Sequence, residues 1–279
     1  MTKHKKRRLD TQNASKSLQP KGKTQPGSKI YQPAKKPSTR KPDPTIPFDA
    51  ADRILLIGEG DFSFAKSIVE HHGCYDVTAT CYDSKDQLFE KYTPQAEQHI
   101  QYLETEGQNV LYGVDATKFS SIKALAKAPQ FDRVIFNFPH VGGKSKDVNR
   151  QVRFNQELLV KFFAAAQTLL TPEGTIVVTL FEGEPYTLWN IRDLARHSGL
   201  EVQRSFKFVA EVYLGYSHSR TLGNVEGGGG WKGEEREART FVLKRKVVQE
   251  VKGSGKRKRG GESEDEEGQE DEASAGALE

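Results

Sequence analysis

The sequence predicts an α/β protein with a mostly parallel, seven-stranded sheet covered by helices on both faces. From Arg53 onward, short apolar runs alternate with helical patterns, as in parallel strands joined by crossover helices. No helical pattern separates the last two apolar runs, which predicts an antiparallel hairpin at the end of the domain. The connecting residues 210–238 contain the run Gly227–Gly230, which we expect to be a flexible loop segment.

Seven apolar runs have the length and composition of strands, because they are rich in the β-branched and aromatic residues that suit a pleated surface. The predicted strands span residues 53–57, 76–82, 109–114, 133–138, 175–181, 201–209 and 239–248.

Five helical patterns lie between the strands, and each ends near a residue that stops helices. The predicted helices span residues 63–72, 94–106, 120–128, 147–170 and 187–198. The first, second and last are followed by glycine, and the other two by a proline within two residues.

Charge is unevenly distributed, although the net charge is only +4. Residues 1–45 carry 13 Lys and Arg against 2 acidic residues, whereas residues 46–243 carry 21 against 26. The C-terminal segment places a basic run before an acidic block. Segments with so few large apolar side chains do not bury enough surface to offset their ordering entropy. We expect disordered tails at 1–45 and 249–279 around one domain at 46–248.

The two cysteines of the chain favour a reducing, intracellular compartment. No run approaches the roughly 18 apolar residues of a membrane span, and no apolar secretory segment follows the start. The basic runs KHKKRR and KRKR fit nuclear import signals or nucleic-acid contacts, with solubilising tails as the alternative.

The stretch LLIGEGDFSFA joins the first strand to the first helix through Gly58 and Gly60. Ligands of open α/β sheets bind beyond the carboxyl ends of the strands, and glycine lets backbone approach them closely. The dinucleotide fingerprint G-x-G-x-x-G fails, because Ser63 occupies its sixth position. An ordinary turn, with Asp61 or Ser63 capping the helix, is the alternative reading.

Two acids end the next two predicted strands. Asp83 is placed to accept the hydroxyls of a ribose, and Asp115 to accept an adenine amino hydrogen. Either acid alone is more often a helix cap or a turn residue. Together, at the ends of successive strands, they favour an adenosine-type ligand.

The fourth predicted strand runs into NFPHVGG, where the reactive end of that ligand is expected. Asn137 and the backbone beside Pro139 are candidates to orient a planar base, and His140 titrates near neutral pH. A turn residue before proline and a surface histidine are the alternatives. A basic cluster follows, which suits a phosphate backbone but also a solvated helix start. Its members are Lys144, Lys146, Arg150 and Arg153.

These motifs, with FEGEPY and YSHSRTLG, resemble the eukaryotic 25S ribosomal-RNA uridine-N3 methyltransferase family, over roughly residues 52–245. That family shares its domain with ferredoxin-fold anticodon-binding proteins. The resemblance implies a Rossmann-like class I methyltransferase fold, S-adenosylmethionine as cofactor, and a nucleolar role in large-subunit rRNA modification. The size of the chain suits the rRNA enzyme better than its larger relatives.

We expect this cofactor at the turn residues Gly58, Glu59, Gly60 and Asp61 and at the two strand-end acids. Leu56 and Phe62 depart from the general class I pattern, which has an acid and a third glycine there. We therefore expect Glu59 or Asp61, with the helix N-terminus, to hold the methionine end of the cofactor.

Methylation at N3 of uridine requires an unpaired or flipped base whose imide proton leaves. The candidates for this chemistry are the Asn137 amide on the base edge and His140 as proton acceptor or orienting donor. The triad Tyr216, His218 and Arg220 is a second RNA-facing candidate, or else a loop packed on the hairpin.

Two rival functions stay open at this point. NFPH partly resembles the D/N-P-P-Y/F motif of amino-methyltransferases, so methylation of adenine or cytosine in RNA is one. A non-catalytic assembly factor that binds pre-ribosomal RNA is the other. We expect a monomer without a metal site, acting on large-subunit rRNA or a pre-ribosomal particle in the nucleus and nucleolus.

Overall fold

The structure is a computed structural model that describes residues 44–143, 145–221, 223–224 and 233–246. Several predictions fall outside these residues: those for Lys144, for Gly227–Gly230, and for the tails except residues 44 and 45.

Seven strands and six α-helices alternate along the described chain. The strands are β1 (Ile54–Ile57), β2 (Val77–Thr80), β3 (Asn109–Leu111), β4 (Phe131–Asn137), β5 (Leu170–Phe181), β6 (Leu200–Lys207) and β7 (Ala238–Arg245). The helices are α1 (Ser63–His72), α2 (Lys85–Tyr92), α3 (Gln95–Thr105), α4 (Lys123–Lys127), α5 (Val148–Gln167) and α6 (Ile191–His197). Short 3₁₀ turns are η1 (Phe119–Ser121), η2 (Tyr186–Trp189), η3 (Ala210–Val212) and η4 (Gly233–Glu235).

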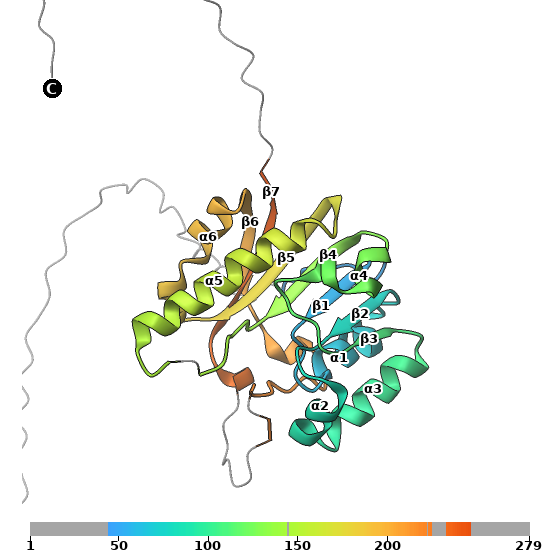
Figure 1. The fold of residues 1–279 in the computed structure, drawn as a ribbon. Helices are drawn as coiled ribbons and strands as arrows, with labels where there is room; N and C mark the ends of the chain where they lie inside the picture. Colours follow the sequence, from blue (N-terminus) through green and yellow to red (C-terminus); the bar gives the residue numbers. More distant parts are fainter. Residues whose placement is uncertain (1–43, 144, 222, 225–232, 247–279) are drawn as a thin grey trace, which may run out of the picture. The chain divides into compact units, whose positions relative to one another are not determined.

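The strands form one sheet in the order β3-β2-β1-β4-β5-β7-β6. The first five pair with one another in parallel, whereas β7 is antiparallel to both β5 and β6. The predicted seven-stranded, mostly parallel sheet with an antiparallel final pair is therefore confirmed (Figure 1). All five parallel strands end at the same edge of the sheet.

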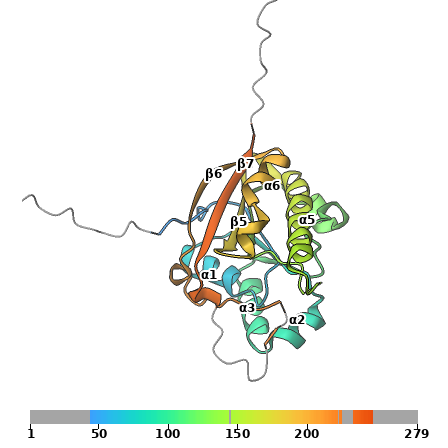
Figure 2. The same cartoon turned by 90° about the vertical axis from the view of Figure 1, so that its left-hand side faces the viewer.

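Helices cover both faces of the sheet, and successive side chains of β1 enter two separate cores. Ile54 and Leu56 pack with residues of α1 and α3, while Leu55 and Ile57 pack with residues of α5. Figure 2 shows α5 and α6 on one side of the sheet and α1 on the other. This two-sided burial explains why the strands read as continuous apolar runs.

Several element boundaries differ from the sequence expectation. The longest helix ends at Gln167 instead of residue 170, because Leu170 already pairs with Phe131 as the start of β5. The helix expected at 187–198 is divided into η2 and α6 by Asn190, whose backbone is left-handed. The helix expected at 120–128 is likewise divided into η1 and α4.

The helix α2 was absent from the sequence prediction. Ser84 caps it, because the Ser84 hydroxyl accepts from the Gln87 backbone while the Gln87 side chain accepts from the Ser84 backbone. This reciprocal capping box is a recognisable signal in the sequence S-x-x-Q. The helix matters for the site, because it carries Lys91 and Tyr92.

Residues 213–221, which we call the strap, cross from the β6 side of the sheet to α1 and α2. The Ser63 hydroxyl donates to the Ser217 carbonyl oxygen at 3.1 Å and accepts from the Ser217 backbone at 3.2 Å. The Tyr92 hydroxyl donates to the Arg220 carbonyl oxygen at 2.6 Å. The strap is therefore fastened over the end of the sheet where β1 and β2 finish.

Candidate active site

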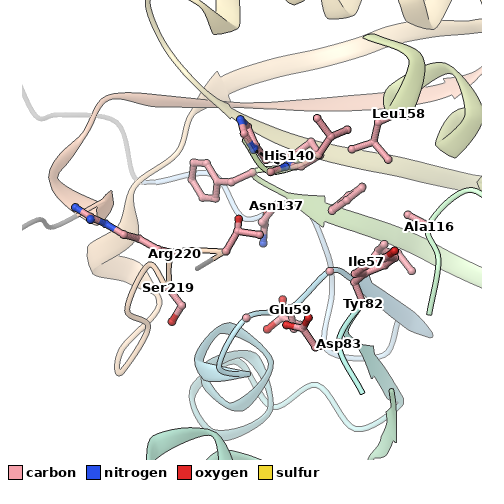
Figure 3. A pocket seen from close by; sticks show the side chains of 18 of the residues that line it. Ile57, Glu59, Tyr82, Asp83, Ala116, Asn137, His140, Leu158, Ser219 and Arg220 are labelled. Carbon is pink, nitrogen blue, oxygen red and sulfur yellow. Dashed lines mark hydrogen bonds between the residues drawn. The ribbon is translucent and has the colours of Figure 1, made fainter. Parts of the chain in front are cut away.

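A cavity of about 930 Å³ opens at the carboxyl ends of the parallel strands, within the size range of small-molecule sites. Its walls are the turn after β1, the segments that follow β2, β3 and β4, one face of α5, the end of β5 and the strap (Figure 3). Predicted site residues that line it are Gly58, Glu59, Gly60, Asp61, Asp83, Asp115, Asn137, Pro139, His140, Tyr216, His218 and Arg220.

The turn after β1 requires glycine at two positions. Gly58 has a φ of +69°, and a Cβ there would lie 2.6 Å from a ring carbon of Phe136. A Cβ on Gly60 would lie 2.9 Å from the Ser219 Cβ in the strap. The bare backbone thus passes between β4 and the strap and forms the floor of the cavity.

Neither Asp61 nor Ser63 is the N-cap of α1, contrary to the prediction, although the Asp61 carboxylate accepts from the Ser63 backbone N–H at 3.0 Å. Asp61 is buried, and the capping position itself is Phe62, whose backbone is left-handed. The Ser63 side chain does not cap the helix but binds the strap.

Glu59 is a partly buried acid that lines the cavity beside Asp61. Burial raises the pKa of Glu59 to about 8, the hydrogen bond from the Ala65 backbone opposes this, and repulsion from Asp61 adds to it. The side chain is therefore largely protonated at neutral pH. A positively charged ligand group beside these two acids would favour the ionised form.

Asp83 has an ion-pair partner, because Lys91 Nζ lies 2.7 Å from its Oδ1. Tyr82, the preceding residue, lines the cavity and is 72% exposed. The sequence analysis counted Tyr82 only as the end of a strand. Its position just before a strand-end acid could have marked Tyr82 as a site residue, because the face of a tyrosine ring stacks well on a planar base.

Asp115 stabilises the loop after β3 by hydrogen bonds and also lines the cavity. Its Oδ1 accepts from the Thr117 backbone at 2.9 Å and from the Thr117 hydroxyl at 2.6 Å. Partial burial raises the pKa of Asp115, but the hydrogen bonds from Thr117 and the nearby Lys118 ammonium together lower it. Asp115 is therefore an ionised turn residue with its carboxylate at the cavity wall.

The end of β4 places Asn137, Pro139 and His140 on one side of the cavity. Asn137 lies opposite Thr179 in the β4–β5 ladder, and Figure 3 shows its side chain between His140 and Glu59. The Gly142 backbone N–H donates to His140 Nδ1 at 2.9 Å, and burial lowers the pKa of His140. Neutral His140 with Nδ1 as acceptor carries its proton on Nε2, so that nitrogen is a donor.

The loop after β4 is fastened to α5 by two side chains that the sequence analysis did not assign. Asn155 is buried, and its amide oxygen accepts from the Val141 backbone at 3.0 Å. The Gln151 amide donates to the Gly142 carbonyl oxygen. The sequence signal for this role was Asn155 itself, an asparagine on the apolar face of a helix. A buried amide side chain needs hydrogen-bond partners.

Within the strap, the Tyr216 hydroxyl lies 2.9 Å from His218 Nδ1. Burial lowers the pKa of His218 to about 4, and the Arg236 charge acts in the same direction. Burial also raises the pKa of Tyr216 well above its usual value. Both side chains are thus neutral at physiological pH. The Arg220 side chain extends away from Asn137 (Figure 3).

The predicted basic cluster lies outside the cavity lining. Lys146, Arg150 and Arg153 are exposed, in the turn before α5 and on its first turns. Asp147 caps this helix by accepting from the Arg150 backbone at 2.9 Å. These side chains are therefore available on the surface and do not contribute to the cavity itself.

Two features are absent from the residues that the structure describes. Among these residues no group of three or more His, Cys, Asp or Glu side chains is arranged to hold a metal ion. In the same part of the chain, no helix combines the length and apolar character needed to cross a membrane.

The family profile described as "rRNA (uridine-N3-)-methyltransferase BTM5-like" matches residues 55–220, which span the turn after β1, the end of β4 and most of the strap. The chain belongs to this BMT5-like family. It is therefore an rRNA uridine-N3 methyltransferase that uses S-adenosylmethionine, and its sheet is that of a class I methyltransferase.

Individual relatives include the 25S rRNA (uridine(2634)-N(3))-methyltransferase of Saccharomyces cerevisiae. It is 31% identical over 266 residues, which cover 77% of this chain and 79% of the yeast protein. The human ferredoxin-fold anticodon-binding domain-containing protein 1 is 32% identical over 60% of this chain, but this covers only 27% of the human protein. The shared part is thus a fraction of a longer human chain.

Solved structures with a similar chain path include TrmN from Thermus thermophilus, with a TM-score of 0.42 and 17% identity, covering 70% of this chain and 44% of TrmN. A methyltransferase from Pyrococcus furiosus has a TM-score of 0.41 and 22% identity, covering 70% of this chain and 76% of its own.

The cavity suits the cofactor of the BMT5-like family. S-adenosylmethionine supplies a methyl group on a positively charged sulfonium, and its methionine end carries an ammonium. Glu59 and Asp61 place two acids beside the turn after β1, where such cations are stabilised. Asp83 and the exposed Tyr82 offer a carboxylate and an aromatic face at the end of β2.

Proposed function

We propose that this chain methylates N3 of one uridine in large-subunit rRNA, at the position equivalent to the uridine named for its yeast relative. The supporting observation is that one cavity combines acids at the ends of β1 to β3 with Asn137 and His140 at the end of β4. The family profile spans residues 55–220, which include both groups, and the yeast relative aligns over 77% of the chain.

The chemistry demands a base that has left its helix. Uridine N3 carries an imide proton and lies in the Watson–Crick edge, so it is accessible only when the base is unpaired or flipped. Holding N3 in line with the methyl group converts the transfer into a reaction between prepositioned partners. We propose that the flipped uracil enters between the loop after β4 and the strap.

We assign His140 the role of hydrogen-bond donor. As Nδ1 accepts from the Gly142 backbone, the neutral ring carries its N–H on Nε2, and His140 lines the cavity. A donor to a uracil carbonyl oxygen stabilises the negative charge that develops as N3 loses its proton. The Asn137 amide, which has both a donor and an acceptor, is assigned to the base edge.

We assign the cofactor to the opposite wall. Asp83 accepts the ribose hydroxyls with Lys91 as its counter-ion, and Tyr82 stacks on the adenine. Asp115 lies where the adenine amino group is expected. Glu59 and Asp61 hold the methionine end, so the methyl group is directed toward the end of β4.

We propose that Lys146, Arg150 and Arg153 bind phosphates of nucleotides that flank the uridine. These cations are exposed next to the loop after β4, and phosphate contacts position RNA without reading its sequence. The basic N-terminal sequence adds affinity for RNA and carries the chain to the nucleus and nucleolus, where it meets a pre-ribosomal particle. Fluorescent fusions with and without residues 1–43 test this location.

Nucleoside analysis tests the reaction directly. The full chain is incubated with labelled S-adenosylmethionine and either naked large-subunit rRNA or pre-ribosomal particles, and the RNA is digested to nucleosides. We expect label in N3-methyluridine, and a stop to reverse transcription at the modified position because the methyl group blocks base pairing. Label in methylated adenosine or cytidine supports an amino-methyltransferase. Cofactor binding without any label supports an assembly factor.

A further inference from the structure

Phe138, between Asn137 and Pro139, has a left-handed backbone with a φ of +50°. Non-glycine residues seldom adopt this conformation, and it persists only where surrounding contacts enforce it. The Phe138 backbone N–H donates to the Thr179 carbonyl oxygen at 2.8 Å, one residue beyond the end of β4. Phe138, whose backbone is strained, directly follows Asn137 in the chain, and Asn137 is the residue that we assign to the uracil edge.

Three aromatic rings pack against the Phe138 ring. The ring centroid of Phe181 lies 4.5 Å away, and that of Phe208 lies 5.5 Å away. The third ring is His218, at 4.5 Å and an angle of 84°. This edge-to-face geometry is a favourable arrangement of two aromatic rings, so His218 contributes packing to the strained residue.

His218 is itself fixed by the strap and its surroundings. The Tyr216 hydroxyl lies 2.9 Å from His218 Nδ1, and the His218 backbone N–H donates to the Glu234 carboxylate at 3.3 Å. The Tyr216 ring packs edge-on against Phe64 and Phe208. A pKa of about 4 makes His218 a weak base, poorly matched to the removal of a proton from uridine N3.

We propose that His218 is a positioning residue for methyl transfer: its ring holds Phe138 and thereby fixes the Asn137 amide opposite the uridine. The inference rests on the proposed function, since it assigns the strap a part in that reaction. It predicts that His218 affects the rate of the chemical step and not the binding of cofactor or RNA.

The first test compares His218→Ala with His218→Phe, which keeps an aromatic ring but has no nitrogen. We expect His218→Ala to lower kcat about tenfold or more, with KM for the rRNA and the calorimetric affinity for S-adenosylmethionine within about twofold of wild type. His218→Phe should recover most of the lost kcat. Equal losses in the two variants would show that a ring nitrogen does the chemistry and would overturn the proposal.

A double-mutant cycle gives a second, independent test. Phe138→Gly adopts a positive φ without strain and has no ring for His218 to hold. In that background His218→Ala should therefore cost little further kcat, because the two residues act as a unit. A full additional loss would mean that His218 acts without Phe138, against the proposal.

Two controls separate the possible failures. If His218→Ala does not fold, Tyr216→Phe replaces it in the cycle, since it removes only the hydroxyl that fixes His218. A wild-type chain that gives no N3-methyluridine overturns the proposed function. An active wild type with full kcat in His218→Ala overturns only this inference.

Discussion

Lys91 Nζ lies 2.7 Å from Asp83 Oδ1, although Lys91 belongs to α2 and Asp83 to the end of β2. The Asp83 side chain is 18% exposed, and the Lys91 ammonium holds this largely covered carboxyl group in place at the cavity wall. A carboxylate that is oriented before the ligand arrives loses less entropy when it binds hydroxyl groups.

Asp83→Ala should weaken S-adenosylmethionine binding by about 1.5–3 kcal/mol, the scale of hydrogen bonds to a charged group. Titration calorimetry on the full chain measures this change. The matched control is Asp86→Ala, an exposed acid on α2 outside the cavity lining, which should bind as wild type. Unchanged affinity in Asp83→Ala would leave Asp83 as the structural partner of Lys91.

Asn137→Ala and His140→Ala should each lower turnover by at least about tenfold, while cofactor affinity stays the same, because both residues are assigned to the base. His140→Gln should be more active than His140→Ala, since an amide N–H still donates whereas an amide does not accept a proton as a base. The exposed His197→Ala is the control. Equal activity of the two His140 variants would speak against the donor role.

Glu59→Gln should change how stability depends on pH. The folded pKa of about 8 is raised above the ordinary value of 4.5, so the stability contribution of protonated Glu59 is complete below 4.5 and is lost as pH rises through 8. Glutamine mimics the protonated acid at every pH. As pH rises from about 5 to about 9, the melting temperature of wild type should therefore fall relative to that of Glu59→Gln. A constant difference across this range would contradict the raised pKa.

The same acid predicts proton release when the cofactor binds. The cationic cofactor should ionise Glu59 near pH 7, so the calorimetric enthalpy of binding should depend on the ionisation enthalpy of the buffer. Glu59→Gln removes the titrating group and should remove that dependence. An identical buffer dependence in the variant would assign the proton to another residue.

Gly58→Ala should be more harmful than Gly107→Ala, although both glycines have positive φ values, +69° and +75°. The left-handed backbone costs an alanine roughly 1–2 kcal/mol at either site. Only at Gly58 would the new Cβ meet a neighbour, the Phe136 ring at 2.6 Å, whereas Gly107 faces open space. Denaturant unfolding and calorimetry should show the larger stability loss and impaired cofactor binding in Gly58→Ala alone.

Replacement of Lys146, Arg150 and Arg153 by alanine should weaken RNA binding and leave cofactor binding intact. If all three contact phosphates, the slope of log affinity against log salt should fall by about 2–3 units. Replacement of the exposed Lys123 and Lys127 of α4, two cations on another surface, is the control. An unaltered salt dependence would show that other cations bind the RNA backbone.

The residues at the strand ends were predictable from the sequence, because parallel strands bring their carboxyl ends to one edge. Gly58, Asp83 and Asp115 follow β1 to β3, Asn137 ends β4, and all four line one cavity, as this rule requires. Local patterns were sufficient here, since each residue lies next to a clear apolar run.

The position of the strap was not predictable in the same way. Ser63 and Ser217 are 154 residues apart in the chain, and their hydrogen bonds depend on tertiary packing that no local pattern encodes. The role of Asn155 in holding the loop after β4 depends likewise on how α5 lies against that loop. The left-handed backbone of Phe138 has no sequence signal, because phenylalanine gives no hint of a positive φ.

The place of β7 in the sheet bears on how this protein is made. β7 is the last strand of the described residues, yet it lies between β5 and β6, and β6 forms the edge beside it. On the ribosome, β5 and β6 therefore emerge before the strand that joins them, and the strap emerges before the sheet beneath it is complete. A nascent chain that stops ahead of Ala238 leaves two unpaired strand edges exposed to aggregation. We expect methyl-transfer competence to arise only after the last strand has left the exit tunnel.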